Sequence, residues 1–314
     1  MNPLPRIFAR QKWLYMRSAV YSQNSFTISQ FYAEFKALTK VRLALSVVFS
    51  SIAGYLLAVD RVEWTALVLL TIGGYALVGA SNAFNQVIER DLDVLMKRTQ
   101  NRPIPAGRMS IKAAIAIAIS LALIGIVCLY TLNAKTALFG SLSVFLYTCV
   151  YTPLKTKTPL AVFVGAIPGA IPFMLGWVAA RGSFGIEPGT LFMIQFFWQF
   201  PHFWALGWML DEDYKRGGFK MLPTGKKDSG TAFQIIFYTL WMMATSILPV
   251  FGFTGELSLS VPAAVLVFVL GGFMLVAAFK LYEKRDQASA RKLMLWSVFY
   301  ISVLQIVYLV DKWI

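Results

Sequence analysis

The sequence predicts an all-α polytopic membrane protein that crosses the bilayer nine times. Of its 314 residues, 58% are hydrophobic and only 14% are charged, whereas a soluble domain usually carries about 25% charged residues. If a membrane helix needs about 20 apolar residues, nine helices use roughly 180 residues and leave only short loops. This composition excludes a soluble α/β enzyme, a disordered chain and a secreted disulfide scaffold.

The apolar residues fall into nine runs, each too long for a strand and poor in charge. In chain order, we expect spanning helices at about 43–59, 64–88, 111–131, 136–152, 159–180, 191–210, 231–252, 261–280 and 290–312. Residues 41–314 then form one membrane domain, and residues 1–40 precede it as a basic arm. Cys128 and Cys149 lie inside apolar runs, so we interpret them as packing residues rather than as metal ligands or a disulfide.

The basic residues are concentrated on one side of the predicted domain. The N-terminal segment and the loops around 89–112, 153–158, 211–230 and 280–292 hold 25 of the 29 Lys and Arg residues. By the positive-inside rule, this side is cytoplasmic, so the N-terminus lies in the cytoplasm and an odd number of spans places the C-terminus outside. Topology therefore explains the net charge of +14, and no nucleic-acid partner is expected.

The first 40 residues contain no acid before Glu34 and no apolar core of a secretory signal. A basic, acid-poor start weakly resembles a mitochondrial presequence. We favour instead a cytoplasmic arm that lies on anionic lipid. The inner membrane of a bacterial cell is accordingly preferred to the mitochondrial inner membrane.

Six of the 15 acidic residues lie in two groups at the predicted cytoplasmic ends of spans 2 and 6. These groups are Glu89, Asp91 and Asp93, and Asp211, Glu212 and Asp213. Oxygen ligands without a neighbouring Cys or His suit Mg²⁺, which is usually held by one or two carboxylates together with substrate phosphates. Since Lys and Arg residues follow each group, the pattern predicts a metal-bridged diphosphate whose oxygens the basic residues neutralise.

The first acidic group continues a polar stripe along the second span. Asn85, Glu89 and Asp93 recur every four residues and so share one helix face, and Asn82 lies about 20° from the same line. An Asn at membrane depth needs a partner. Asn82 is therefore equally well interpreted as a ligand-binding residue or as one that hydrogen-bonds to a neighbouring helix.

The sixth span carries His202, the single histidine of the chain, in an aromatic segment. On a straight helix His202 and Asp213 share a face and Asp211 lies opposite, which favours Asp213 as the inward acid, although Pro201 should kink the helix. A lone His is often a satisfied polar contact, but it is also a common axial ligand of haem. The aromatic rings suit helix interfaces or a cavity that stabilises a carbocation, and both interpretations stay open.

Taken together, these segments resemble the UbiA superfamily of membrane prenyltransferases. Asn85-x3-Glu89-x3-Asp93, followed by Lys97-Arg98 and Arg102-Pro103, resembles the first Asp-rich motif of the superfamily. The segments that resemble its haem-modifying branch are Tyr151 to Thr158, Trp198-Gln199-x-Pro201-His202-Phe203, and Asp213-Tyr214 through Met221-Leu222-Pro223. Glu89 departs from the family pattern, which usually has Asp at this position. Because Glu is longer by one methylene, the metal can lie at a different place, and Asp91 stays open as a further ligand.

The resemblance implies a nine-helix bundle around a central cavity that opens to the cytoplasm. It implies a Mg²⁺-dependent enzyme that transfers a farnesyl group from farnesyl diphosphate to a vinyl group of haem B, with addition of water, and so gives haem O for haem–copper terminal oxidases. The expected catalytic and metal-binding residues are Asn85, Glu89, Asp93 and Asp213. The expected substrate-binding residues are Asn82, Arg98, Arg102, Tyr151, Lys155, Trp198, His202, Lys215 and Arg216. The expected partners are the two substrates, the lipid bilayer and proteins of haem–copper oxidase biogenesis.

Three other functions fit parts of the sequence less well. A UbiA-type enzyme acting on an aromatic quinone precursor is disfavoured by the segment around His202. A transporter would carry its acids near the membrane midplane at broken helices, whereas both acidic groups lie at helix ends. A non-catalytic oxidase assembly factor would show no Mg²⁺-dependent turnover.

Overall fold

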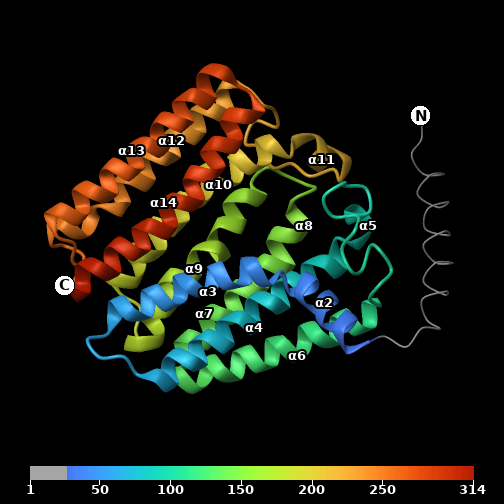
Figure 1. Cartoon of the computed structure of the whole chain (residues 1–314), viewed down its shortest axis with the longest axis horizontal. Helices are drawn as coiled ribbons and strands as arrows, with labels where there is room; N and C mark the ends of the chain where they lie inside the picture. The colour runs from blue at the N-terminus through green and yellow to red at the C-terminus, as the bar shows by residue number, and fades with distance from the viewer. Residues whose placement is uncertain (1–26) are drawn as a thin grey trace.

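Long helices running side by side make up the described part of the chain, residues 27–314, in the computed structural model (Figure 1). They are α3 (Val41–Ala58), α4 (Trp64–Ile88), α6 (Ile111–Leu132), α7 (Ala134–Phe145), α9 (Ala161–Arg181), α10 (Ile186–Met209), α12 (Ser229–Ser246), α13 (Val261–Lys284) and α14 (Gln287–Trp313). Short helices join or extend them: α2 (Ile28–Thr39), α5 (Arg90–Asp93), η1 (Leu146–Tyr151), α8 (Thr152–Leu154), α11 (Asp211–Arg216) and η2 (Leu248–Phe251). The prediction of an all-α protein is confirmed for these residues.

Within residues 27–314, seven helices are long and apolar enough to cross a membrane. They are α3, α4, α6, α9, α13, α14 and the continuous stretch Ala134–Leu154. The other two predicted spans correspond to α10 and α12, in which Gln, His, Thr and Trp residues lower the mean hydropathy. The multi-pass membrane character is therefore established.

Side-chain caps explain why the helices start close to the predicted boundaries. Ser110, Asn133, Asp228, Ser260 and Asp286 each accept a hydrogen bond from a backbone N–H in the first turn of the helix that follows. Such caps satisfy N–H groups that have no partner within the helix. Large apolar side chains on the outer faces, such as Leu123 of α6 and Phe273 of α13, are exposed as contact with lipid requires.

The fourth predicted span changes its helix type before it ends. α7 passes into the π-helix η1 and then into α8, and Thr152 Oγ1 donates a hydrogen bond to the Tyr147 carbonyl at 2.8 Å. π-helical turns occur often at functional sites. Here the turn brings Tyr147 and Tyr151 to the same cavity as Lys155, which follows α8.

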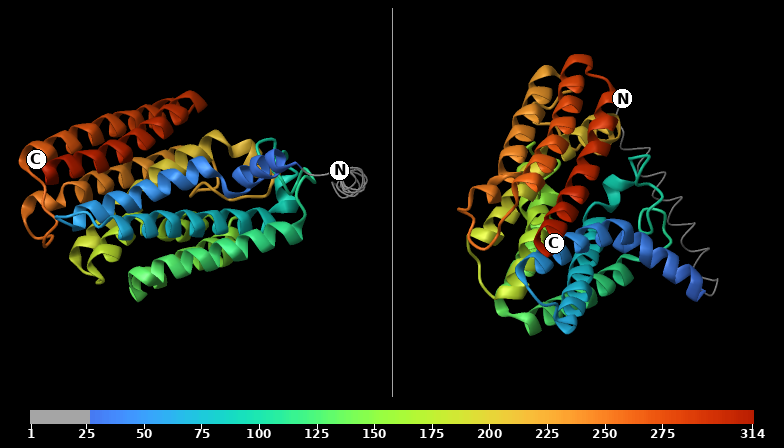
Figure 2. Two further views of the ribbon diagram at one scale, coloured as in Figure 1. Left: turned by 60° about the horizontal axis from the view of Figure 1, so that its bottom comes forward. Right: turned by 60° about the vertical axis from the view of Figure 1, so that its left-hand side comes forward.

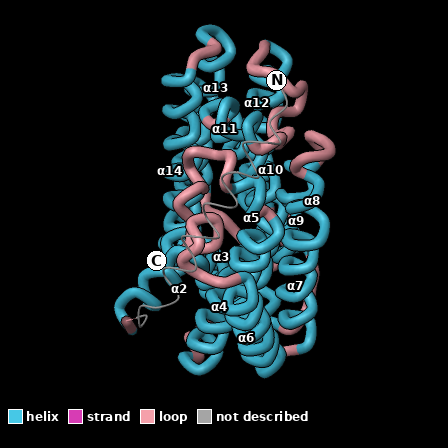
Figure 3. Tube along the Cα trace, turned by 90° about the vertical axis from the view of Figure 1, so that its right-hand side faces the viewer, coloured by secondary structure: helices cyan, strands magenta, loops and turns pink. Residues whose placement is uncertain are grey.

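The short helices and the longer loops gather at one end of the bundle. Figures 1 and 2 show α5, α8 and α11 at the end where α2 enters, whereas the C-terminal end of α14 lies at the opposite end. Figure 3 looks onto the loop-rich end, where the loop after α5 lies beside α11. Both acidic groups identified in the sequence belong to this end.

Residues 1–26 of the predicted arm lie outside the described residues. The rest of the arm forms α2, whose last turn is tied to α4 because Gln86 Nε2 donates hydrogen bonds to the carbonyls of Ala37 (3.2 Å) and Leu38 (2.9 Å). Lys40 joins α2 to α3 in a left-handed conformation, with φ of 50°. This turn directs the chain from α2 into the first span.

Candidate active site

The polar stripe predicted on the second span borders a cavity of about 130 Å³ at the loop-rich end of the bundle. Residues from position 40 to position 221 line it, so it is assembled from most of the chain. Its charged and amide-bearing lining residues are Lys40, Asn85, Glu89, Asp93, Arg98, Arg102 and Lys155. Four cations against two carboxylates leave an excess of positive charge, which suits an anionic ligand. We call this cavity the acid cavity.

The predicted stripe of Asn85, Glu89 and Asp93 stays on one face although the helix breaks at Glu89. α4 ends at Ile88, Glu89 forms the cap with φ of −88° and ψ of 3°, and α5 continues to Asp93. The Asp93 N–H still donates to the Glu89 carbonyl at 2.7 Å. The spacing of four residues is therefore retained, and Asn85, Glu89 and Asp93 all reach the acid cavity.

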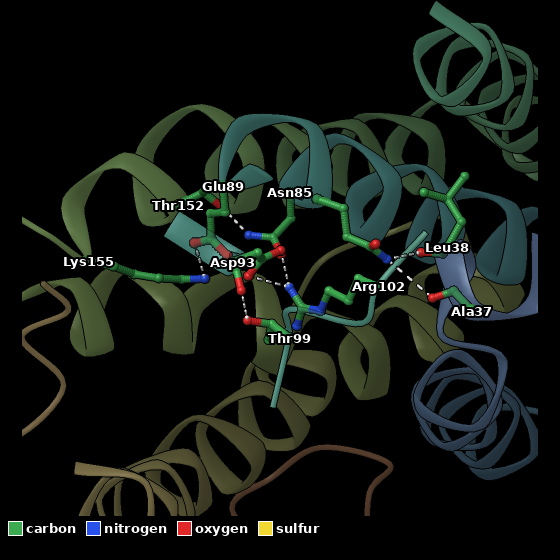
Figure 4. A network of polar contacts seen from close by, with 10 residues as sticks. Ala37, Leu38, Asn85, Glu89, Asp93, Thr99, Arg102, Thr152 and Lys155 are labelled. Carbon is green, nitrogen blue, oxygen red and sulfur yellow. Dashed lines mark hydrogen bonds and ion pairs between the residues drawn. The ribbon is translucent and has the colours of Figure 1, made fainter. Parts of the chain in front are cut away.

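Glu89 is held by Lys155 in a buried ion pair. Lys155 Nζ lies 2.7 Å from Glu89 Oε1, and the two side chains are only 9% and 4% exposed. The Lys155 ammonium also lies 4.6 Å from the centre of the Tyr151 ring, a cation–π contact that adds to its attraction for Glu89. Figure 4 shows this pair beside Asn85, whose Nδ2 donates to Thr152 Oγ1 at 3.1 Å.

Asp93 is fully buried and is neutralised by Arg102. Arg102 Nη1 contacts both carboxylate oxygens, at 2.9 and 2.7 Å, and Thr99 Oγ1 donates to the Asp93 carbonyl at 2.9 Å (Figure 4). Burial raises the pKa of Asp93 above its ordinary value, and the Arg102 guanidinium opposes this shift. A buried carboxylate of this kind needs a cation beside it to stay ionised.

Asn82 lies outside the acid cavity. Its side chain is buried, and Nδ2 donates to the Thr39 carbonyl at 3.1 Å. This is the helix–helix hydrogen bond that the sequence offered as the alternative to ligand binding. Asp91, the middle acid of the first group, is exposed and pairs with Arg90 at 3.3 Å.

Asp213 connects the second acidic group to the loop that follows the first. Its two carboxylate oxygens accept hydrogen bonds from the backbone N–H groups of Lys97 (2.8 Å) and Arg98 (3.1 Å), and Arg216 lies 3.4 Å away. The chain breaks at Leu210 between α10 and α11, so the straight-helix argument for Asp213 does not apply. Asp213 does not line the acid cavity, whereas Arg98, whose backbone it holds, does.

Asp211 and Lys215 border a second cavity of about 240 Å³ on the other side of Tyr214. Asp211 is nearly buried and contacts Lys215 at 2.8 Å and Lys227 at 3.7 Å. Tyr214, Phe219 and Met221 line both cavities and so form the wall between them. Of the predicted basic partners, Lys215 therefore lines the second cavity rather than the acid cavity, and Arg216 lines neither of the two.

His202 and Trp198 form a separate cluster with α14. The two rings stack at 4.8 Å with an interplanar angle of 16°, His202 Nδ1 lies 2.8 Å from Ser297 Oγ, and Trp198 Nε1 donates to the Ser297 carbonyl at 2.6 Å. Ser297 Oγ has one hydrogen, which it donates to the Met294 carbonyl at 2.7 Å. The network therefore assigns the imidazole proton to Nδ1 and leaves a lone pair on Nε2.

Several lining residues were not predicted from the sequence. Tyr147, Phe203 and Tyr214 line the acid cavity but lay within segments interpreted as packing or as part of a motif. In the sequence, Lys40 is only one of the basic residues that indicate topology, because nothing in its position reveals the left-handed turn that brings it to this cavity. Burial, reinforced by the positive charges of Arg102 and Lys155, lowers the pKa of Lys40 to about 7.

The donor set of the acid cavity fits a hard divalent cation. Within residues 27–314, no three Asp, Glu, His or Cys side chains are close enough to hold a metal ion between them. Two carboxylates and the Asn85 amide nevertheless border one cavity, and no Cys or His is among its lining residues. Mg²⁺ commonly takes one or two carboxylates and completes its octahedron with phosphate oxygens and water, which is the combination that this cavity allows.

Comparison with known proteins identifies the class. A family model described as the UbiA prenyltransferase family matches residues 47–303, and the chain belongs to this family. Among solved structures, a digeranylgeranylglyceryl phosphate synthase has a TM-score of 0.75 at 15% identity, covering 89% of this chain and 98% of its own. A UbiA homologue from Archaeoglobus fulgidus bound to GPP and Mg²⁺ has a TM-score of 0.62 at 14% identity, covering 88% of this chain and 99% of its own. These likenesses establish the fold.

Within the family, the chain falls among the protoheme IX farnesyltransferases. A protein of that name from Christiangramia forsetii is 62% identical over 282 residues, which are 90% of this chain and 94% of the relative. Another from Flavobacterium psychrophilum is 62% identical over 290 residues, or 91% of this chain and 97% of the relative. The resemblance found in the sequence is thus confirmed.

Proposed function

We propose that this prenyltransferase transfers a farnesyl group from farnesyl diphosphate to a vinyl group of haem B, with addition of water, to give haem O and diphosphate. The observation that carries the proposal is 60–62% identity to proteins named protoheme IX farnesyltransferase over at least 90% of the chain. The acid cavity supplies the chemistry that such a reaction needs, since it combines buried carboxylates with an excess of cations.

The reaction makes three demands on the site. The bond from farnesyl C1 to the diphosphate oxygen breaks with its electron pair on the oxygen, so the leaving group gains charge that must be stabilised. C1 then bonds to the terminal vinyl carbon, and the positive charge passes to the carbon next to the pyrrole, where water adds and releases a proton. Water must be excluded before that point, and the vinyl group must lie close to C1.

Asn85, Glu89 and Asp93 are the residues that would hold Mg²⁺, which when bound supplies Lewis-acid stabilisation of the diphosphate. Lys155 and Arg102 neutralise Glu89 and Asp93 in the described structure. With a diphosphate bound beside the carboxylates, Lys155 and Arg102 would be placed to donate hydrogen bonds to its oxygens, because both line the same cavity. Arg98 lines the same cavity and adds a further donor.

Asp213 is proposed to act on the diphosphate site in one of two ways. As described, it holds the backbone of Lys97 and Arg98 and so positions the loop that carries Arg98. Each carboxylate oxygen of Asp213 keeps a second lone pair beside its hydrogen bond, so Asp213 can also contribute an oxygen to a metal ion. Lys215, on the same short helix, lines the neighbouring cavity and is assigned to anionic groups that approach from it; Arg216, which pairs with Asp213, is assigned to the same anionic groups.

His202 is proposed as a contact to haem B. Its Nε2 lone pair is free to bind iron or to accept a hydrogen bond from a protonated propionate, because Nδ1 is committed to Ser297. Stacking on Trp198 fixes the plane of the ring, and the adjacent Phe203 lines the acid cavity. His202→Ala should weaken binding of haem B and change its absorption spectrum; an unchanged affinity and spectrum would exclude this contact. Tyr151, which lines the acid cavity, is assigned to shelter the allylic cation.

We infer that the chain crosses a bacterial inner membrane nine times, with its N-terminus in the cytoplasm. α10 packs against α9, α12 and α14, and α12 packs against α13, so both lie within the bundle; with 24 and 18 residues they measure about 36 and 27 Å. The described chain begins and ends at opposite ends of the bundle (Figure 1), as an odd number of spans requires. Transfer of the product to proteins of oxidase biogenesis stays a prediction.

The proposed function is tested with the purified full-length protein in lipid nanodiscs. Farnesyl diphosphate and Mg²⁺ are supplied with either haem B or 4-hydroxybenzoate, and the products are identified by mass. The proposal expects a product from haem B alone. Prenylation of 4-hydroxybenzoate instead would assign the protein to the quinone branch, and the absence of any Mg²⁺-dependent product would favour an assembly factor.

A further inference from the structure

We propose that the second cavity binds the inorganic diphosphate that the reaction releases and leads it out of the acid cavity at the loop-rich end of the bundle. The inference rests on the proposed function, because that function produces diphosphate in the acid cavity. It gives the anionic groups expected in the second cavity a chemical identity, and it gives the wall between the two cavities a role in product release.

The two cavities follow one another along one face of α10. Phe203 lines the acid cavity, and Gly207, one turn later, lines the second cavity. Residues four apart share a helix face. α10 continues from Gly207 to the loop-rich end, where α11 follows it (Figure 1). The second cavity is therefore reached from the acid cavity by moving one turn along α10 towards this end.

Three side chains form the wall that separates the cavities. Tyr214, Phe219 and Met221 line both, and the rings of Tyr214 and Phe219 contact each other with centres 5.9 Å apart. On the side of the acid cavity, Lys155 Nζ lies 5.5 Å from the centre of the Phe219 ring. Arg98 Cζ lies 5.9 Å from the centre of the Tyr214 ring. The wall is thus adjacent to two cations that are placed to hold a diphosphate.

The loop of residues 217–225, which we call the wall loop, carries two of these three side chains. Gly218 and Gly225 have left-handed backbone conformations, with φ of 73° and 76°, which glycine adopts without the strain that a side chain would bring. Between them, the Lys220 N–H donates to the Lys155 carbonyl at 2.7 Å. The wall loop is therefore tied to a residue of the acid cavity and has a pivot near each end, so it can move without any change in the long helices.

The charges of the second cavity suit a small polyanion. Lys215 and Lys220 line it together with Asp211, and Lys227 lies 3.7 Å from the Asp211 carboxylate. Three cations against one carboxylate leave an excess of positive charge. The volume is about 240 Å³, against about 130 Å³ for the acid cavity, so an anion that fits the acid cavity also fits here. Because the Lys215 side chain is 63% exposed, the second cavity reaches the water into which diphosphate is released.

The first test asks whether inorganic diphosphate binds while the acid cavity is occupied. The full-length protein in nanodiscs is saturated with Mg²⁺ and labelled farnesyl thiolodiphosphate, a non-reactive analogue whose retention is followed, and inorganic diphosphate is titrated by calorimetry. We expect one further diphosphate per protein, bound at least fivefold more weakly by Lys220→Met, which retains its backbone N–H. Lys157→Met is the matched control and should bind as the parent does, because Lys157 is exposed and lines neither cavity.

The second test fixes the wall loop in place. A Cβ atom at Gly207 would lie 3.5 Å from Met221 Cβ, a separation that a disulfide bridges. Gly207→Cys and Met221→Cys are therefore combined in a protein whose Cys128 and Cys149 are replaced by Ser. Once the disulfide has formed, product diphosphate should stay in the acid cavity. We expect one prenyl transfer to haem B per protein and then at least tenfold slower turnover, which a reductant restores. Gly207→Cys alone should not respond to oxidant.

Either test can overturn the inference. Absence of diphosphate binding beside the analogue, or equal affinities of the parent and Lys220→Met, would do so. Unchanged turnover of the cross-linked protein would show that diphosphate leaves by another side, and loss of the first turnover would assign the wall loop to substrate entry; both results contradict the inference. If the analogue does not bind, or the parent yields no haem product, the proposed function fails instead. The calorimetric comparison, repeated without the analogue, then decides whether the second cavity binds diphosphate.

Discussion

Lys155 Nζ lies 2.7 Å from Glu89 Oε1, although 66 residues separate them in the chain. Arg102 holds Asp93 in the same way, so the two carboxylates that line the acid cavity are both neutralised by cations from that cavity. A metal ion alone must compete with these cations, whereas a metal diphosphate offers them new partners. The acid cavity should therefore bind metal and diphosphate cooperatively.

Lys155→Met tests this exchange of partners. Removing the ammonium frees Glu89, so binding of Mn²⁺ in the absence of diphosphate, followed by electron paramagnetic resonance, should tighten. The kcat/KM for farnesyl diphosphate should fall about 100-fold or more, because a phosphate donor is lost. Lys157→Met changes an exposed lysine two residues away and should alter neither quantity. Unchanged or weaker Mn²⁺ binding in Lys155→Met would contradict the exchange.

Glu89→Asp restores the acid that the family usually carries at this position. The shorter side chain keeps the charge but withdraws from Lys155 by about one bond length, roughly 1.5 Å, so we expect a loss of activity of about tenfold or less. Glu89→Gln removes the charge and should cost about 100-fold or more. Equal activities of the two variants, measured with saturating Mg²⁺, would show that the charge at position 89 is not used.

Lys40 gives the affinity for farnesyl diphosphate a defined pH dependence. The pKa of Lys40 is lowered to about 7, so the ammonium form predominates below pH 7 and is lost as the pH rises through that value. We expect the KM for farnesyl diphosphate to rise between pH 6.5 and pH 8.5. Lys40→Arg keeps its charge throughout this range and should flatten the rise; an identical slope in both proteins would exclude Lys40 as its source.

Asp213→Ala separates the two roles proposed for this residue. If Asp213 positions the loop, the amides of Lys97 and Arg98 should exchange hydrogen at least tenfold faster, because their acceptor is lost. The KM for farnesyl diphosphate should rise as well. Asp91→Ala, which removes an exposed acid of the first group, is the control. Unchanged exchange at both amides combined with weaker Mg²⁺ binding would instead favour metal ligation.

The sequence was sufficient to predict those parts of the fold and site that depend on local periodicity. The second span was predicted at 64–88 and α4 is Trp64–Ile88, because a long apolar run between polar boundaries leaves little choice. The stripe of Asn85, Glu89 and Asp93 reached one cavity as expected, because its four-residue spacing continued across the break at Glu89.

The features that local patterns could not predict depend on breaks and on long-range contacts. The break at Leu210 turns Asp213 towards the backbone of Lys97. A helical wheel assumes a straight helix, so it could not predict this orientation. The left-handed turn at Lys40 similarly brings the Lys40 side chain to the acid cavity, although the sequence indicates only a role in topology. The seventh predicted span reached residue 252, whereas α12 ends at Ser246 and a 3₁₀ turn containing Pro249 follows, since proline cannot continue the hydrogen-bond ladder.

The central claim is that the acid cavity carries out farnesyl transfer to haem B. The most direct test is a mass spectrum of the haem recovered after the purified protein is incubated with haem B, farnesyl diphosphate and Mg²⁺, compared with Asp93→Asn shown to insert normally. The account predicts a haem heavier by one farnesyl group and one hydroxyl with the parent protein, and at least a 100-fold smaller yield with Asp93→Asn. Near-normal yield from Asp93→Asn would contradict it.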